Sequence, residues 1–453
     1  MQHHTIDRRS ALARLAATIP AALIRRDAFA VSDEPTARAA SDEGTPRDAS
    51  PRTAWMATGE PVCGFEPFDH LMIGFLRDQS VPGASLAVAK GDRIVYSRAF
   101  GTVDRSTGGP VLPASIFRIA SLSKPLTAMT VVRLVERGIM SLDDRCLDRL
   151  RTHRRLFDLP APTDSRFAEV TVRQLLRHTG GWDREQSTDP MFRSVEIARE
   201  AGAAPPATVE HIIRYMVGRP LDFAPGQRYA YSNFGYCLLG RILESVTGCD
   251  YSDVVRREVL EPLHATRLRL GRTRERSSHE TAYHEDTEAR GPSVFADQLG
   301  TPVPTPYGAW CLEAMDAHGG WLASAEDLVR LSIACFDRDD LISDRARGWI
   351  TERSEGRAGW NEDGSPKAPY YGLGWMIRTA KDSINVWHTG SLPGTSTLLV
   401  RRHDGYHWAV LFNGRNARDG RRLSAVIDPL LHRAADAVTD WPDASRGAAA
   451  PGS

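Results

Sequence analysis

A serine and a lysine stand three residues apart in the stretch "FRIASLSKPLTAM", residues 117–129. Only four of the 57 basic residues in the chain are lysines, and Lys124 in this stretch is one of them. A serine hydroxyl becomes a good nucleophile once a neighbouring base removes its proton. Burial lowers the pKa of a lysine amine enough for this task, whereas an arginine guanidinium stays protonated in proteins. Ser121 and Lys124 are therefore a candidate nucleophile and general base.

The residues after Ser121 predict a helix that places both side chains together. In "LSKPLTAMTVVRLV", residues 122–135, apolar side chains recur every three or four positions. Pro125 fits the first turn of such a helix, where no backbone N–H is needed. Ser121 then lies at the N-terminus of the helix and Lys124 one turn along on the same face. The spacing alone is weak support, because about 0.3 such pairs occur by chance in a chain of this composition, and Lys124 alone would also fit a surface charge.

A second motif lies in "APGQRYAYSNFGYCLLG", residues 224–240. Residues i and i+2 of an extended segment point the same way, so Tyr231 and Asn233 can face one site. The Tyr231 phenol is a candidate general base or proton relay for Ser121. The Asn233 amide is a candidate to hold a substrate carbonyl and to steer Lys124. Taken alone, the two residues are better explained by a half-buried tyrosine and a helix-capping asparagine.

A third motif, "WHTGSLPG" at residues 387–394, follows a predicted strand. Its glycines let the backbone approach a ligand closely, and one backbone N–H could contribute to an oxyanion hole. A strand followed by a glycine-rich turn explains the same residues without any ligand.

The surrounding sequence predicts an α+β fold. Two β-rich runs in 83–101 flank Lys90-Gly91-Asp92, and two more, "STLLVRR" and "YHWAVLFN", flank His403-Asp404-Gly405, so each pair predicts a hairpin. Residues 371–377 and 384–388 are further predicted strands. Between these groups, 170–182 and 233–248 have helical periodicity with a threonine start and glycine stops. We expect one mostly antiparallel sheet flanked by helices, with a helical insertion at about 136–300.

In this order and setting, "SLSK", "YSN" and "HTG" resemble the motifs of the serine β-lactamase and penicillin-binding-protein superfamily. The resemblance is strongest to its branch of class C β-lactamases, DD-peptidases and family VIII esterases. It extends from about residue 80 to 415 and includes "LVERGIMSLDD", "TVRQLLRHTGG" and "GGWLASAEDLVRLS". The resemblance implies the β-lactamase/transpeptidase-like fold.

The resemblance also implies a role for each motif residue. Ser121 matches the acylated nucleophile, Lys124 its partner on the helix, and Tyr231 the residue that carries a proton to the leaving group. The backbone N–H groups of Ser121 and Ser391 match the oxyanion hole. No cofactor and no metal are implied. The positions that match substrate-binding residues are Asn233, His388, Thr389, Gly390 and Ser391.

His388 departs from the Lys-Thr-Gly form of the third motif that many relatives have. A lysine there helps to hold a substrate carboxylate, whereas an unperturbed histidine titrates at about pH 6.5 and is only partly charged at neutral pH. We therefore expect a serine hydrolase that acts through an acyl-enzyme on an ester or amide of a small acyl compound. The alternatives are a DD-peptidase for cell-wall peptides, a weak β-lactamase, and a non-catalytic penicillin-binding or sensor module, against which the intact Ser, Lys and Tyr argue.

The resemblance implies a small-molecule or peptide substrate as the partner, and the oligomeric state stays open. The formal net charge is zero, which gives no reason to expect nucleic acid, and no apolar run is long enough for an integral membrane span. None of the six cysteines forms a CxxC pair, although disulfides stay open for an exported protein. "HETAYH" at 279–284 is one residue too long for the zinc motif HExxH, so we expect a polar loop.

The N-terminus resembles a twin-arginine export signal. "IDRRSALARLAATIPAALI" contains Arg8-Arg9 before an apolar stretch, and "AFA" at 28–30 matches a cleavage site, although Arg14 interrupts the stretch. We expect an export signal at 1–30, a flexible linker at 31–58, the hydrolase domain at 59–440 and a loose tail at 441–453. The protein would then be periplasmic or extracellular; the alternative is a frayed N-terminus on a cytoplasmic protein.

Overall fold

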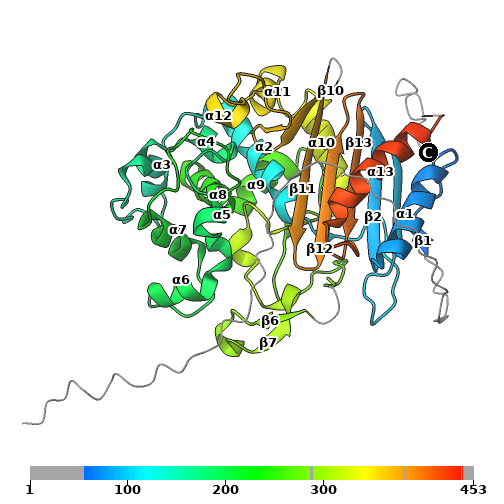
Figure 1. Ribbon diagram of the computed structural model, residues 1–453, viewed down its shortest axis with the longest axis horizontal. Coiled ribbons are helices and arrows are strands. Elements are labelled where there is room, and N and C mark those ends of the chain that lie inside the picture. The colour runs from blue at the N-terminus through cyan, green and yellow to red at the C-terminus, as the bar shows by residue number, and fades with distance from the viewer. Residues whose placement is uncertain (1–55, 286–288, 381–382, 440, 442–453) are drawn as a thin grey trace, which may run out of the picture. The chain divides into compact units, whose positions relative to one another are not determined.

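The computed structural model describes residues 56–285, 289–380, 383–439 and 441 (Figure 1). The chain divides into two units, 1–50 and 51–453, and every described residue belongs to the second. The predicted export signal, residues 31–55 of the predicted linker and the tail from 442 lie outside the described residues. A search of the described helices finds none that is long and apolar enough to cross a membrane.

In the described part of the chain, eight strands form a central antiparallel sheet in the order β1-β3-β2-β13-β12-β11-β10-β9. The predicted fold class and both predicted hairpins are confirmed. The N-terminal strands are β1 (Ala57–Thr58), β2 (Gly83–Lys90) and β3 (Arg93–Gly101). The C-terminal strands are β9 (Tyr370–Tyr371), β10 (Met376–Ala380), β11 (Ser383–Leu392), β12 (Thr395–Arg401) and β13 (Tyr406–Phe412).

Both predicted boundaries of the hydrolase domain need correction. Ala57 pairs with Phe100 in the sheet, so the folded part begins before the predicted end of the linker at 58. Trp441 is partly buried and packs edge-on against Phe65 of the core, with ring centroids 5.0 Å apart, so it belongs to the folded domain and not to the tail. Both residues stand in short stretches with polar neighbours, so the sequence pattern does not predict these contacts.

Helices cover both faces of the sheet. On one face lie α1 (Glu66–Gln79) and α13 (Leu423–Ala437), which pack on each other (Figure 1). Both helices also pack on sheet residues such as Leu86 and Val88. On the other face α10 (Ala325–Phe336) packs on β2 and β13, where Ala87 and Ala409 point. Alternate side chains of β2 therefore pack into two separate hydrophobic cores, one on each face of the sheet.

The predicted helical insertion follows α2 (Ser123–Glu136). The stretch predicted as a helix at 233–248 is confirmed as α8, which ends at the left-handed Gly248. The helix predicted at 170–182 is shorter, because α4 starts at its Thr171 capping box but stops before His178, whose φ is +57°. The α-helices of the insertion are α3 (Cys146–Arg151), α4 (Val172–Leu176), α5 (Arg184–Ser187), α6 (Ser194–Glu200), α7 (Val209–Val217), α8 (Asn233–Thr247) and α9 (Tyr251–Val255).

The insertion ends later than the predicted limit near 300, because the chain packs on the central sheet again only at α10. Short elements delay the return: β5 (Arg269–Leu270), the hairpin β6 (Arg290–Pro292) and β7 (Pro302–Pro304), and β8 (Trp321–Ala323). Strand β8 pairs with β4 (Phe117–Arg118), directly before the Ser121 motif. Strands of two or three residues have no periodicity that a sequence can show. The remaining helices are α11 (Asp344–Thr351) and α12 (Gly356–Gly359).

Residues 279–284 are not helical, as expected, but they are not a solvated polar loop. Glu280 is buried, lies 3.7 Å from the buried guanidinium of Arg118 and accepts a hydrogen bond of 2.7 Å from Tyr283. A buried ion pair explains the acidic residue in this segment. All six cysteines lie in the described residues and are free thiols.

Candidate active site

Ser121 lies in a short 3₁₀ turn, Ala120–Leu122, that leads into α2. The residue before it, Ala120, has a left-handed φ of +49°, which is uncommon for any residue with a side chain. Strand β12 holds this strained segment, because the hydroxyl of Thr397 donates to the carbonyl oxygen of Ile119 at 2.9 Å. Strain of this kind is maintained by its surroundings and is frequent at active sites.

Gly390 of the third motif lies directly against the same backbone. A Cβ atom at this position would stand 2.2 Å from the carbonyl oxygen of Ile119 and 2.3 Å from Oγ1 of Thr397, so only glycine fits. The register of the sheet pairs Gly390 with Thr397 and Ser391 with Ser396. The third motif, including Thr389 and Ser391 on either side of Gly390, therefore runs beside the residues that lead into Ser121.

Lys124 is completely buried and its amine has three neighbours. Nζ lies 3.1 Å from Oγ of Ser121 and donates to Oδ1 of Asn233 at 2.8 Å and to the carbonyl oxygen of His318 at 3.0 Å. A neutral amine has two N–H groups and one lone pair, so two carbonyl acceptors leave the lone pair for Ser121. Burial holds the pKa of Lys124 well below its usual value, and the charge of Arg184 adds to this effect.

Tyr231 contacts the nucleophile from the other motif. Its O–H group donates to Oγ of Ser121 at 2.9 Å. Burial raises the pKa of Tyr231 to about 12, so at neutral pH the phenol keeps its proton and is suited to donate it. The ring of His178 packs 4.3 Å from the ring of Tyr231, and Nδ1 of His178 accepts the backbone N–H of Ser232 at 3.1 Å. His178 thus supports the Tyr231 segment.

Asn233 is the first residue of α8, whose cap is Ser232 rather than Asn233. Its amide is therefore available for the site: Oδ1 accepts from Lys124, and Nδ2 donates to Oδ2 of Asp189 at 2.6 Å. The structure brings four predicted residues from two distant segments into one hydrogen-bonded group: Ser121, Lys124, Tyr231 and Asn233.

His388 lies in the third motif but faces a tyrosine that the motif does not include. Its Nδ1 lies 2.7 Å from its neighbour's carbonyl oxygen, that of Thr389, and its Nε2 lies 2.9 Å from the hydroxyl of Tyr371. A carbonyl only accepts, so Nδ1 carries the hydrogen and Nε2 accepts from Tyr371. Burial lowers the pKa of His388 to about 3, and the charge of Lys124 adds to the effect. The expectation of a partly charged His388 at neutral pH is therefore wrong.

Sequence reasoning missed several residues around the site. The sequence around Tyr371 predicts only a strand, and the sequence around His178 predicts only a helix. Asp189 precedes Pro190, a common helix-start signal, but its contact with Asn233 depends on tertiary structure. His318 contributes a backbone carbonyl, which no side-chain motif can reveal.

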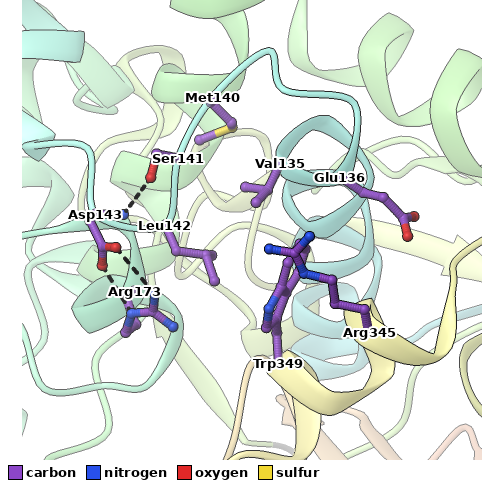
Figure 2. A pocket seen from close by; sticks show the side chains of 9 residues that line it. All are labelled: Val135, Glu136, Met140, Ser141, Leu142, Asp143, Arg173, Arg345 and Trp349. Carbon is purple, nitrogen blue, oxygen red and sulfur yellow. Dashed lines mark hydrogen bonds and ion pairs between the residues drawn. The ribbon is translucent and has the colours of Figure 1, made fainter.

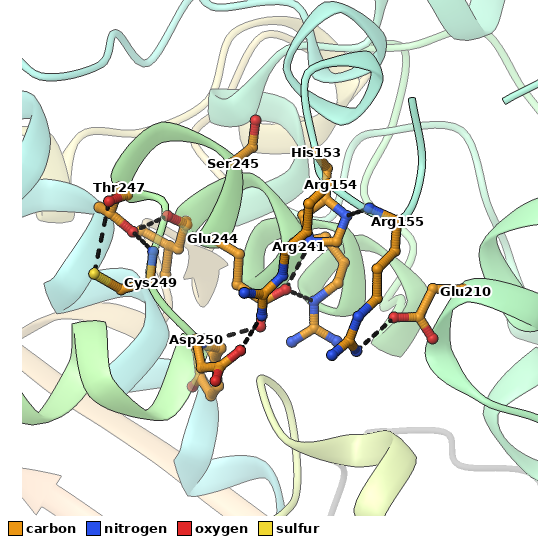
Figure 3. Close-up of polar contacts among 12 residues, drawn as sticks. His153, Arg154, Arg155, Glu210, Arg241, Glu244, Ser245, Thr247, Cys249 and Asp250 are labelled. Carbon is orange, nitrogen blue, oxygen red and sulfur yellow. Dashed lines mark hydrogen bonds and ion pairs between the residues drawn. The ribbon is translucent and has the colours of Figure 1, made fainter. Parts of the chain in front are cut away.

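A buried ion-pair network lies behind the site. Arg241 of α8 lies 2.5 Å from Asp316. Arg241 also lies 2.9 Å from Glu244, and Glu244 lies 2.8 Å from His153 (Figure 3). Asp316 is two residues before His318, whose carbonyl oxygen meets Lys124. The network therefore ties α8 to the loop that orients the lysine.

A hollow of about 330 Å³ at the C-terminal end of α2 is separate from this group. The ion pair of Arg173 with Asp143 lies on one side of it, and Arg345 lies over the ring of Trp349 on the other (Figure 2). No residue of the three motifs lines it, and we assign it no role in catalysis. Among the described residues, no group of three or more His, Cys, Asp and Glu side chains is arranged to hold a metal ion.

Comparison with known proteins agrees with this geometry. The family model described as Beta-lactamase matches residues 68–431. The chain belongs to the β-lactamase family. The predicted membership in the serine β-lactamase and penicillin-binding-protein superfamily is thereby confirmed, and this family member is a serine hydrolase.

Named relatives of this β-lactamase family member include both penicillin-binding proteins and esterases. Penicillin-binding protein 4* of Bacillus subtilis (strain 168) is 27% identical over 368 residues, which cover 77% of this chain and 71% of that protein. Esterase EstB of Burkholderia gladioli is 31% identical over 240 residues, which cover 52% of this chain and 58% of the esterase. The structure of an octameric penicillin-binding protein homologue from Pyrococcus abyssi gives a TM-score of 0.60 at 25% identity, covering 81% of this chain and 77% of that one.

Proposed function

We propose that this enzyme is an esterase-like hydrolase that transfers the acyl group of a small neutral ester or amide to Ser121 and then to water. The observation that carries the proposal is the state of His388 in the third motif. Burial keeps this residue neutral, and both ring nitrogens are already bonded within the protein. The position that holds a cationic lysine in many relatives thus offers no charge to a substrate carboxylate.

The proposed acylation step uses the hydrogen bonds of the site. Neutral Lys124 takes the proton of Ser121 while Oγ forms a bond to the carbonyl carbon. The bond to the leaving group then breaks, and Tyr231 gives its proton to the departing oxygen or nitrogen. A proton from the Lys124 ammonium returns to the phenolate and restores both groups. Water repeats the sequence in the second half of the reaction and releases the acid.

Aromatic side chains near the site support an apolar substrate. Tyr229 is 36% exposed, and its ring lies 5.8 Å from the ring of Tyr371. Exposed aromatic surface at an active site favours an apolar acyl or alcohol group.

A second candidate is a DD-peptidase, and one observation favours it. Nε of Arg415 lies 3.2 Å from Oγ of Ser391, so a guanidinium lies beside the third motif. The same guanidinium lies 3.9 Å from the carboxylate of Glu285. A guanidinium can bind the terminal carboxylate of a peptide. The similarity to penicillin-binding protein 4* points the same way.

A substrate panel separates the two candidates. Purified protein would be incubated with nitrophenyl acetate and butyrate, a D-Ala-D-Ala peptide and a cephalosporin, with product release and intact mass followed together. The esterase proposal predicts a kcat/KM for the neutral esters well above that for the peptide. Faster turnover of the peptide, lost selectively in Arg415→Gln, would favour the DD-peptidase. An acyl-enzyme that never turns over on any member of the panel would favour the penicillin-binding sensor module.

A further inference from the structure

We propose that Asp189 is a positioning residue that fixes the amide of Asn233 so that its oxygen, and not its nitrogen, faces Lys124. The inference needs only the acylation of Ser121 and is independent of which substrate class the enzyme prefers. Asp189 belongs to none of the three motifs and reaches the site from the segment between α5 and α6.

The hydrogen-bonding capacity of each group fixes the orientation of the amide. Oδ2 of Asp189 lies 2.6 Å from Nδ2 of Asn233, and Oδ1 of Asn233 lies 2.8 Å from Nζ of Lys124. Burial raises the pKa of Asp189, whereas the hydrogen bonds from Asn233 and Met191 and the charge of Arg184 favour its ionised form. An ionised carboxylate can only accept hydrogen bonds, so the amide turns its N–H₂ group to Asp189. Its oxygen is then directed to Lys124, where it accepts one amine N–H and leaves the lone pair of the neutral amine for Ser121.

Without this acceptor, the amide could rotate by half a turn. An N–H₂ group facing Lys124 would compete for the lone pair of the amine that has to take the proton of Ser121. Asp189 therefore acts on the nucleophile through two intervening residues, although it touches neither Ser121 nor the site of bond formation.

The local backbone is built to present this carboxylate. Thr188, the residue before Asp189, has φ of +68°, a conformation that residues with side chains rarely adopt. Oδ1 of Asp189 accepts the backbone N–H of Met191 at 3.1 Å, so the carboxylate also caps the short turn Pro190–Phe192. Pro190 and Met191 are buried and anchor the turn. Both carboxylate oxygens thus have assigned partners.

The same segment places a positive charge near the catalytic pair. The guanidinium of Arg184 lies 4.7 Å from the centre of the Tyr231 ring, and its charge lowers the pKa of Lys124, whereas that of Asp189 raises it. Neutralising Asp189 should therefore lower the pKa of the general base further. The other titratable groups around Lys124 are two tyrosines whose pKa values burial raises, Tyr231 and Tyr236, and three histidines whose pKa values burial lowers: His178, His318 and His388.

The test compares two isosteric substitutions in one segment. Asp189→Asn keeps the size of the side chain but allows the amide of Asn233 to turn. Asp183→Asn is the matched control, because Asp183 caps α5 in the same segment and pairs with Arg228 without touching Asn233. The readout is the rate of Ser121 labelling by a fluorophosphonate across pH, with thermal unfolding measured in parallel. Labelling by this probe does not depend on ester preference, so failure of the esterase proposal and failure of this inference give different results.

We expect Asp189→Asn to lower the maximum labelling rate in the pH–rate profile by about 10- to 100-fold. We also expect the acid limb of that profile to shift to lower pH. Asp183→Asn should stay within about twofold of wild type at every pH, since a helix cap that does not contact the catalytic residues acts on stability and not on the base. Should Asp189→Asn unfold, Asp189→Ser retains a cap for Met191 while being too short to reach Asn233, and the same loss is expected. Equal labelling profiles for Asp189→Asn and Asp183→Asn, or a loss that follows the melting temperature in both, would overturn the inference.

Discussion

Nζ of Lys124 lies 3.1 Å from Oγ of Ser121, and both of its other hydrogen-bond partners are carbonyl oxygens. This arrangement suits a neutral amine whose lone pair points at the serine, and it also suits the ammonium that forms when the serine proton is transferred. The same three contacts therefore serve before and after the proton moves, which limits the rearrangement that acylation requires.

Replacing Lys124 with arginine tests whether the residue is a base or only a positive charge. Arg keeps the charge but cannot release a proton, so we expect kcat/KM to fall by about 10²–10⁴-fold. Steady-state kinetics on nitrophenyl butyrate, with circular dichroism to verify folding, is the measurement. A folded arginine variant with near-normal acylation would show that Lys124 acts only through its charge.

Tyr231→Phe removes the phenol proton and leaves the ring that packs on His178. Because burial raises the pKa of Tyr231 to about 12, the account gives it the role of proton donor to the leaving group. We expect a large fall in kcat with little change in KM. The loss should be smaller for esters with acidic leaving groups, such as nitrophenol, than for alkyl esters. A change confined to KM would instead assign Tyr231 to substrate binding.

Gly390→Ala tests the contact between the third motif and the segment before Ser121. The added methyl group would stand 2.2 Å from the carbonyl oxygen of Ile119, so backbone must shift, and we expect a loss of activity together with about 1–3 kcal/mol of unfolding free energy. The matched control is Gly348→Ala in α11, where nothing lies within 4 Å of the new methyl group and stability should hold or rise. Chemical denaturation measures both, and equal behaviour of the two variants would contradict the tight approach at Gly390.

The pH dependence of stability tests the buried His388. The pKa of His388 is lowered to about 3 in the folded protein, against about 6.5 in an unfolded chain, so the unfolded state binds more protons between these values. Its contribution to stability is present above pH 6.5 and is lost as pH falls toward 3. We expect His388→Gln to unfold with a shallower pH dependence over this range, measured by urea titration. A slope as steep as that of the wild type would mean that His388 is already charged in the folded state.

The sequence predicted most of the framework of the site but not its electrostatics. Alternating apolar residues on either side of Lys90-Gly91-Asp92 and His403-Asp404-Gly405 were sufficient to place both hairpins. The periodic apolar residues of α8 and the glycine at its end, Gly248, likewise predicted this helix. Such patterns are local, because each residue reports on neighbours within a few positions.

Contacts between distant segments had no such signal. The neutral state of His388 depends on burial and on Tyr371, 17 positions away in the chain, and the orientation of Asn233 depends on Asp189, 44 positions away. The typical titration value of a histidine was therefore the wrong starting point for His388, since the fold and not the residue type sets its pKa. The 3₁₀ turn at Ser121 is likewise imposed by β12 through Thr397, whereas the local pattern indicated only a helix.

The measurement that tests the central claim most directly is intact-mass analysis of the protein after mixing with nitrophenyl butyrate and, separately, with a fluorophosphonate. The account predicts one added acyl or phosphonyl group per chain, located by peptide mapping on Ser121, and no adduct and no turnover in Ser121→Ala. Full turnover by a folded Ser121→Ala variant, or an adduct mapped to any other residue, would contradict it.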